Sequence, residues 1–119
     1  MVRIYGIGVD ICQISRLDTK INLTPRLLER LFHPSECQLS APSLAARFAA
    51  KEAFMKAIGD YKGLYFREIE IVKDALGKPR LKLHNRTRET VANLGDFALH
   101  LSLSHDSGFA IATVVVETE

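Results

Sequence analysis

Residues 44–59 read LAARFAAKEAFMKAIG, and this stretch decides how the chain folds. The pattern predicts a helix that is apolar on nearly every side, although it carries three basic residues and one carboxylate. A helix at the surface of a protein confines its apolar residues to one stripe, so this helix is expected to be largely buried. Its charged side chains must therefore be paired, bind a ligand or face a cavity.

Within this helix, Glu52 and Lys56 lie one turn apart on the same face. Such a pair is typical of an ordinary ion pair on the solvated edge of a helix. The same arrangement also offers a metal-binding carboxylate beside an ammonium group that can hold a phosphate. Both interpretations stay open on this segment alone.

Residues 5–10, YGIGVD, predict a short strand that ends in Asp10. Apolar residues at helical spacing follow it, namely Ile11, Ile14, Leu17 and Ile21. Asp10 is therefore expected at a strand-to-helix junction, where an aspartate commonly caps the helix. An equally weighted interpretation is a ligand for a hard cation, because Gly6 and Gly8 let another backbone or a ligand approach closely. The two interpretations are compatible.

Residues 99–108, LHLSLSHDSG, predict a half-buried strand that is closed by a polar turn. His105 stays in register with the leucines of this strand. A histidine at such a position is more often a satisfied residue at the edge of a core than a catalytic group. Ser102 and Ser104 lie on the other face, but no Gly-x-Ser-x-Gly motif surrounds either of them, so a serine hydrolase is not favoured.

The rest of the chain predicts a scaffold around these three segments. Its elements are a helix after Thr24 and Pro25, a hairpin of residues 69–71 and 81–83, a helix over residues 87–94, and a hairpin of residues 99–105 and 109–116. This order predicts one α+β domain, residues 1–119, with a largely antiparallel sheet packed against helices. Residues 111–116 are almost continuously apolar, which indicates burial on both faces, the second by another subunit.

Composition excludes several classes of protein. The chain has 119 residues, 47% of them hydrophobic, and a net charge of +2, which argues against a general nucleic-acid binder. It shows neither a signal-peptide pattern nor an apolar run long enough to cross a bilayer, so a soluble, cytoplasmic protein without membrane partners is expected. Cys12 and Cys37 lack metal-site spacing and are expected to be free thiols.

The positive charge is concentrated in the first half of the chain. Residues 1–62 contain nine Lys or Arg against six Asp or Glu, whereas residues 63–119 contain seven against eight. Four basic residues lie on or beside the first two predicted helices, namely Arg16, Lys20, Arg26 and Arg30. Solvated helix faces often have this composition, and a docking surface for an acidic partner is the alternative.

Together with the turn Gly77-Lys78-Pro79, these segments resemble, in order and spacing, the holo-[acyl-carrier-protein] synthases, the short 4′-phosphopantetheinyl transferases. The resemblance covers essentially the whole chain and implies a 4′-phosphopantetheinyl transferase-like fold. The connection from Glu36 to Leu44 looks short for the family, which leaves its conformation undefined.

The resemblance implies that 4′-phosphopantetheine is transferred from coenzyme A to a serine hydroxyl of an apo acyl carrier protein, in fatty acid biosynthesis, with release of adenosine 3′,5′-bisphosphate. Asp10 and Glu52 would hold Mg²⁺, and Lys56 would meet the pyrophosphate. The base that accepts the serine proton would be Glu52 or a water on the metal. The candidates for the other coenzyme phosphates are Arg47, Lys51 and His105.

The resemblance also implies a homotrimer whose sites span subunit boundaries. Asp10 and His105 are expected from one subunit, and Glu52 and Lys56 from its neighbour. The residues expected to bind the carrier protein are Arg16, Arg26 and Arg30. Two alternatives stay open: a non-catalytic module that binds a carrier protein or a nucleotide on the same scaffold, and a transferase that serves a different carrier.

Overall fold

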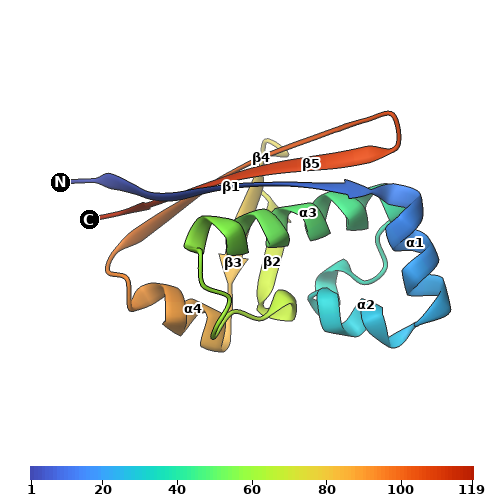
Figure 1. Cartoon of the computed structure of the whole chain (residues 1–119), viewed down its shortest axis with the longest axis horizontal. Helices are drawn as coiled ribbons and strands as arrows, with labels where there is room; N and C mark the ends of the chain where they lie inside the picture. The colour runs from blue at the N-terminus through green and yellow to red at the C-terminus, as the bar shows by residue number, and fades with distance from the viewer.

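The computed structural model describes residues 1–119 and has α+β architecture with antiparallel sheets, as predicted (Figure 1). Its elements in chain order are β1 (Arg3–Gln13), α1 (Ile14–Leu23), α2 (Arg26–Leu31), the 3₁₀ turn η1 (Pro34–Glu36), α3 (Ala41–Ile58), the 3₁₀ turn η2 (Phe66–Glu68), β2 (Ile69–Lys73), β3 (Pro79–Leu83), α4 (Asn85–Ala92), β4 (Phe97–Asp106) and β5 (Phe109–Thr118).

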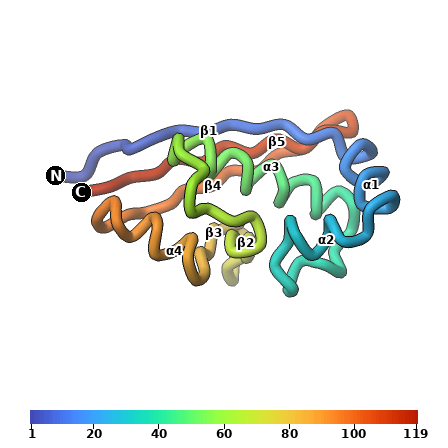
Figure 2. The backbone as a smooth tube through the Cα atoms, turned by 60° about the horizontal axis from the view of Figure 1, so that its bottom comes forward, coloured from blue at the N-terminus to red at the C-terminus, as the bar shows by residue number.

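Three long strands form the main sheet, in the order β1-β5-β4, and both pairs are antiparallel. The predicted hairpin of β4 and β5 is confirmed, with its turn at Ser107 and Gly108, where φ is 52° and 82°. The second predicted hairpin is also confirmed, because β2 pairs with β3 in a separate two-stranded sheet. Both views place α1 and α2 at one end of the molecule and α4 towards the other, with the two termini side by side (Figures 1 and 2).

Helix α3 packs lengthwise on the main sheet and forms the centre of the core (Figure 2). Eleven of its 18 residues are buried, which confirms the prediction from its composition. The helix begins after Ser40 with Pro42 in its first turn, and it ends at Gly59, whose φ of 87° is the left-handed conformation common at helix ends. None of the helices combines the length and the apolar character that crossing a bilayer requires.

Two glycines of β1 allow the strand to lie directly against α3. A Cβ atom at Gly6 would lie 1.8 Å from the carbonyl oxygen of Ala57, and one at Gly8 would lie 1.8 Å from that of Ala53. The close approach foreseen at these glycines is therefore to a helix backbone, not to a ligand. It fixes how far β1 stands from α3 and hence where Asp10 lies.

The prediction that Asp10 lies at a strand-to-helix junction is wrong. Strand β1 continues to Gln13, and Asp10 pairs with Ala112 inside the ladder. Helix α1 begins at Ile14 after Gln13, and Asp10 is not its cap. The reason is tertiary: the first residues of β5 pair with the end of β1, which local spacing alone assigned to a helix.

The most deeply buried charges form an ion pair beneath α3. Lys51 is fully buried, and its Nζ donates to Glu36 Oε1 at 2.7 Å, to the carbonyl of Leu31 at 2.8 Å and to that of Phe66 at 3.1 Å. Glu36 also accepts from the backbone N–H groups of His33 and Ile71. Burial lowers the pKa of Lys51, and the Glu36 carboxylate opposes that shift. The short connection from Glu36 to α3 is thereby anchored at its start.

The outer face of the main sheet exposes apolar side chains. Ile7 is 62% exposed and Ile11 59%, and Ile111 on β5 lies among them. Alternate residues of β5 are buried by α3, so within one chain only one face of this strand is covered. The burial of both faces predicted for residues 111–116 is not achieved by the chain alone.

We predict that Gly8→Ala destabilises the fold by about 3 kcal/mol or more, because the new methyl group meets a helix backbone that cannot move aside. Urea denaturation followed by circular dichroism measures this loss. Gly77→Ala is the control: its φ of 80° is unfavourable for alanine, but no atom lies within 4 Å, so a loss of about 1–2 kcal/mol is expected. Equal losses in the two variants would contradict the close approach.

A second prediction concerns the buried ion pair. Lys51→Met should destabilise the protein by about 3–5 kcal/mol, because Glu36 keeps its charge in a buried site without its main partner. Adding Glu36→Gln to Lys51→Met should recover part of that loss, since the uncompensated charge is removed. The same denaturation experiment is applied to Lys51→Met, Glu36→Gln and the double variant. A loss of stability in the double variant that equals the sum of the two single losses would rule out the coupling.

Candidate active site

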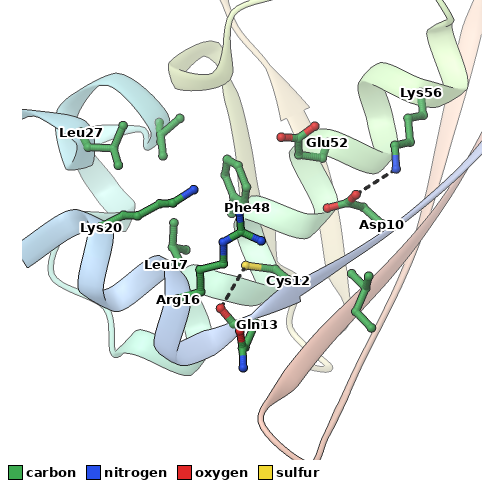
Figure 3. A pocket seen from close by; sticks show the side chains of 12 residues that line it. Asp10, Cys12, Gln13, Arg16, Leu17, Lys20, Leu27, Phe48, Glu52 and Lys56 are labelled. Atoms are coloured by element: carbon green, nitrogen blue, oxygen red, sulfur yellow. Dashed lines mark hydrogen bonds and ion pairs between the residues drawn. The ribbon is translucent and has the colours of Figure 1, made fainter. Parts of the chain in front are cut away.

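A hollow of about 530 Å³ opens between the end of β1, α1, α2 and the middle of α3. This volume falls in the range of small-molecule sites. Figure 3 shows Asp10, Glu52 and Lys56 gathered at one side of the hollow, and Arg16 and Lys20 reaching in from α1. The three residues that the sequence singled out for catalysis therefore meet in one place.

Lys56 bridges α3 and β1. Its Nζ donates to Asp10 Oδ1 at 2.9 Å and to the carbonyl of Val9 at 3.1 Å. The hydrogen bond to Asp10 raises the pKa of Lys56, so the ammonium stays charged. The simple alternative of an intrahelical ion pair with Glu52 is not what the structure shows, because the partner of Lys56 lies on another element.

Glu52 forms no hydrogen bond and no ion pair within the chain, although it is partly buried. Burial raises the pKa of Glu52, the charge of Asp10 raises it further, and Lys56 opposes the shift. Two carboxylates therefore repel each other at the rim of a hollow, and one of them has no partner. Oxygen donors of this kind suit a hard divalent cation, so the residues present fit Mg²⁺.

The opposite wall of the hollow is apolar, which sequence reasoning did not identify. Leu27, Leu31 and Phe48 line it together with the buried Cys12. Burial raises the pKa of the Cys12 thiol, so this cysteine is protonated and behaves as part of the wall. From the sequence alone, these apolar residues would be placed in the core. They line a site only because α2 and α3 leave a gap between them.

Arg47 and His105 lie in a different hollow of about 490 Å³, which shares no lining residue with the first. Its polar lining includes Lys73, Lys78, Ser102 and Ser104. The Gly77-Lys78-Pro79 turn and the polar face of β4 thus meet the start of α3. Arg47 Nε is buried without a hydrogen-bond partner and lies 3.7 Å from Glu36 Oε2. This Nε atom faces the buried Glu36 carboxylate, so it is not open to a ligand in the hollow.

Lys51 reaches neither hollow, in contrast to the expectation that it binds coenzyme A. Its three ammonium donors are used inside the core, so it has no free donor for a phosphate. The expected division of the site between subunits is also wrong in one respect. Asp10 and Lys56 are in direct contact within one chain, and they cannot come from opposite sides of a boundary.

The basic residues of the first two helices divide in the structure. Arg16 and Lys20 line the hollow of Asp10, and Arg26 is exposed at the start of α2. Arg30 instead lines a further hollow near His33 and His84. The predicted basic surface therefore reaches the hollow of Asp10 through Arg16, whereas Arg30 faces a different hollow.

Known proteins resemble this chain in both sequence and fold. A family model described as the 4′-phosphopantetheinyl transferase superfamily matches residues 6–114. A holo-[acyl-carrier-protein] synthase of Clavibacter sepedonicus is 45% identical over 116 residues, which cover 98% of each chain. The crystal structure of a holo-[acyl-carrier-protein] synthase from Neisseria meningitidis superposes with a TM-score of 0.88 at 33% identity, covering 96% of this chain and 98% of that one.

A second solved structure is a Helicobacter pylori holo-[acyl-carrier-protein] synthase in complex with coenzyme A, with a TM-score of 0.78 and 39% identity over 92% of this chain and 98% of that one. The resemblance seen in the sequence is thus confirmed over nearly the full length. By sequence and fold, the chain belongs to the 4′-phosphopantetheinyl transferase superfamily, as an enzyme of the holo-[acyl-carrier-protein] synthase family.

Proposed function

We propose that this chain transfers 4′-phosphopantetheine from coenzyme A to a serine hydroxyl of an apo acyl carrier protein, with Mg²⁺ and with release of adenosine 3′,5′-bisphosphate. The observation that carries the proposal is the contact of Asp10 with Lys56 beside an unpartnered Glu52, at the rim of a hollow with an apolar wall. Relatives of the same family that bind coenzyme A support it.

Asp10 and Glu52 would hold the Mg²⁺. When bound, the cation would neutralise charge on the pyrophosphate oxygens and orient them. Two carboxylates are enough, because Mg²⁺ usually takes one or two protein carboxylates and completes its octahedron with water and phosphate. An incoming cation would also relieve the repulsion that raises the pKa of Glu52.

The chain's own groups account for the other requirements of the reaction. The Lys56 ammonium is half-exposed and can pass from Asp10 to a pyrophosphate oxygen, where it stabilises the charge of the leaving group. The serine proton would pass to Glu52, which makes no hydrogen bond within the chain, or to water. The wall of Leu27, Leu31 and Phe48 would hold the apolar part of the pantetheine arm and exclude water.

Incubation with coenzyme A, Mg²⁺ and an apo acyl carrier protein tests the activity. Intact-mass measurement of the carrier should show the gain of one phosphopantetheine group, and the gain should disappear when EDTA removes the metal. An unmodified carrier under these conditions would favour the rival interpretation, a module that binds a carrier or a nucleotide without chemistry. The presence of the Asp10, Glu52 and Lys56 constellation speaks against that rival, since binding alone does not need it.

We predict that Asp10→Asn lowers turnover by about 100-fold or more, since it removes one charge from the cation site. The change also lowers the pKa of Glu52, because the charge of Asp10 is one of its causes. Mg²⁺ needs the ionised carboxylate, so its binding to the unaltered protein is lost as the pH falls through the raised pKa of Glu52. Calorimetric titration should find that this loss occurs at lower pH in Asp10→Asn.

The matched control is Glu52→Gln, in which the pH dependence of Mg²⁺ binding in this window should vanish. A Mg²⁺ affinity that is unchanged in both variants would contradict the assignment of the two carboxylates. Circular dichroism should show that both proteins remain folded, since neither side chain is part of the core.

The basic residues of α1 and α2 would form the docking surface for the carrier protein. Arg16 lines the rim of the hollow, and Arg26 is exposed nearby on α2. Acyl carrier proteins are the acidic partner that the resemblance implies, and opposite charges on docking surfaces mainly steer association. Arg30 would contribute from the edge of this surface, because it faces the next hollow.

Reversing Arg16 and Arg26 to Glu should raise KM for the carrier by about 10-fold and weaken its salt dependence, with little change in KM for coenzyme A. Arg88→Glu on α4 is the control, since Arg88 is exposed on a different part of the surface. Initial rates at varied carrier and coenzyme concentrations separate the two effects. A rise in KM for coenzyme A instead would place the arginines in the nucleotide site.

The working unit would be a homotrimer in which the hollow of Arg47 and His105 from one subunit completes the site of the next. Two separate hollows suit coenzyme A, because its pyrophosphate and its 3′-phosphate can each be held in one of them. The exposed apolar face of β1 and β5 supplies the surface that such an assembly buries. The free thiols fit a cytosolic enzyme, and the modification of an acyl carrier protein fits fatty acid biosynthesis.

Light scattering should give the mass of three chains, and Ile7→Asp should shift it towards the monomer with loss of turnover. Leu76→Asp, at a side chain that is 94% exposed in the β2–β3 turn, should change neither. Lys56→Ala and His105→Ala subunits that are mixed after reversible dissociation should regain activity. At some subunit boundaries, an intact Lys56 of one subunit then meets an intact His105 of its neighbour. A monomeric mass for the unaltered protein at working concentrations would remove the trimer.

A further inference from the structure

A cluster of two histidines and a glutamate lies outside the proposed active site. His33 precedes η1, Glu70 belongs to β2, and His84 precedes α4. One ligand atom from each residue can be chosen such that all three lie within 4.8 Å of one another. His84 Nε2 is 2.8 Å from Glu70 Oε1, and His33 Nδ1 is 3.6 Å from Glu70 Oε2. Three segments distant in the sequence thus converge on one carboxylate.

The cluster faces a hollow that shares no lining residue with the hollow of Asp10. The side chains of His33 and His84 are 28% and 25% exposed, and that of Glu70 is 12% exposed. The two imidazole rings stack with their centroids 4.7 Å apart. A site with this degree of exposure is accessible to a small ion, and its remaining coordination positions can be filled by water.

We propose that His33, Glu70 and His84 form a binding site for a divalent transition-metal ion of the zinc class. Two imidazoles and one carboxylate with a water in the open position are an established ligand set for such ions. The ion would tie η1, β2 and the start of α4 together. It would therefore reinforce the turn that carries Glu36, the partner of Lys51.

Hydrogen bonds already hold the side chains of the cluster together. Ser35 Oγ donates to Glu70 Oε2 at 2.6 Å, and the Ser35 N–H donates to His33 Nδ1 at 3.2 Å. Ser35 Oγ also lies 2.9 Å from His33 Nδ1, and His84 Nε2 donates to Glu70 Oε1 at 2.8 Å, so a bound ion would replace the contacts of both imidazole nitrogens.

The ligand atoms decide which cations are accepted. Arg30, Arg67 and Arg86 line the same hollow, and Arg86 is held by Glu68 at 3.9 Å and over the ring of Tyr65. Their positive field opposes every divalent cation equally, and Mg²⁺ gains little from imidazole nitrogen to offset it. An ion with strong bonds to imidazole nitrogen withstands it. The site is therefore expected to bind Zn²⁺ or Co²⁺ and to reject Mg²⁺, in contrast to the site of Asp10 and Glu52.

Titration of the whole protein with Zn²⁺ by calorimetry, and with Co²⁺ by visible absorption, tests the proposal in the presence of excess Mg²⁺, which occupies the carboxylates of the other site. His33→Asn and His84→Gln remove one imidazole each while keeping an amide that can make the same hydrogen bonds. Each should weaken Zn²⁺ binding by more than about 100-fold, because a direct ligand is lost. Zn²⁺ should also raise the melting temperature of the unaltered protein in a concentration-dependent way.

His100→Gln is the matched control, since His100 forms a pair with Glu117 on β4 and β5 but has no second histidine beside it. It should leave Zn²⁺ binding unchanged. In the unaltered protein, ring-nitrogen NMR signals of His33 and His84 should shift with Zn²⁺ while that of His100 stays. Zn²⁺ binding that survives both substitutions, or unshifted signals of His33 and His84, would overturn the proposal even where a variant fails to fold.

Discussion

The close contact between the backbone of β1 and α3 is the constraint on which the rest of the structure depends. Gly6 and Gly8 have no side chain, so the strand lies directly on the carbonyl groups of Ala57 and Ala53. Two residues further along β1, this approach brings Asp10 within hydrogen-bonding distance of Lys56. The packing of the core and the geometry of the candidate active site therefore follow from one contact. A wider spacing would separate the two halves of the site.

The charged residues of α3 serve two different purposes, and the burial of each side chain determines which one. Lys51 is fully enclosed and satisfied by Glu36 and two carbonyl groups, so it stabilises the fold and the turn before the helix. Glu52, the next residue, reaches the rim of a hollow and keeps its oxygens free. Lys56 links this rim to β1. A satisfied charge supports the structure, and an unsatisfied one at an accessible place is available for chemistry.

The local sequence pattern predicted a helix or hairpin correctly where that element depends mainly on its own residues. The buried helix follows from its composition, and both hairpins follow from alternation and turn residues, as the pairing of Ile69 with Leu83 shows. The pattern predicted the wrong secondary structure where residues far away in the sequence determine it. Residues 11–13 have helical spacing but form strand because β5, almost a hundred residues away, pairs with them. Glu36 was missed for the same reason, since its burial arises from segments that meet only in the fold.

If the contact of β1 with α3 builds a cation site from Asp10 and Glu52, the ion should be visible by anomalous diffraction. Crystals of the protein soaked with coenzyme A and with Mn²⁺ in place of Mg²⁺ should show a strong anomalous peak at coordination distance from an oxygen of each carboxylate, with Lys56 turned to the pyrophosphate. A Mn²⁺ peak that contacts neither Asp10 nor Glu52, beside an ordered pyrophosphate, would contradict this assignment.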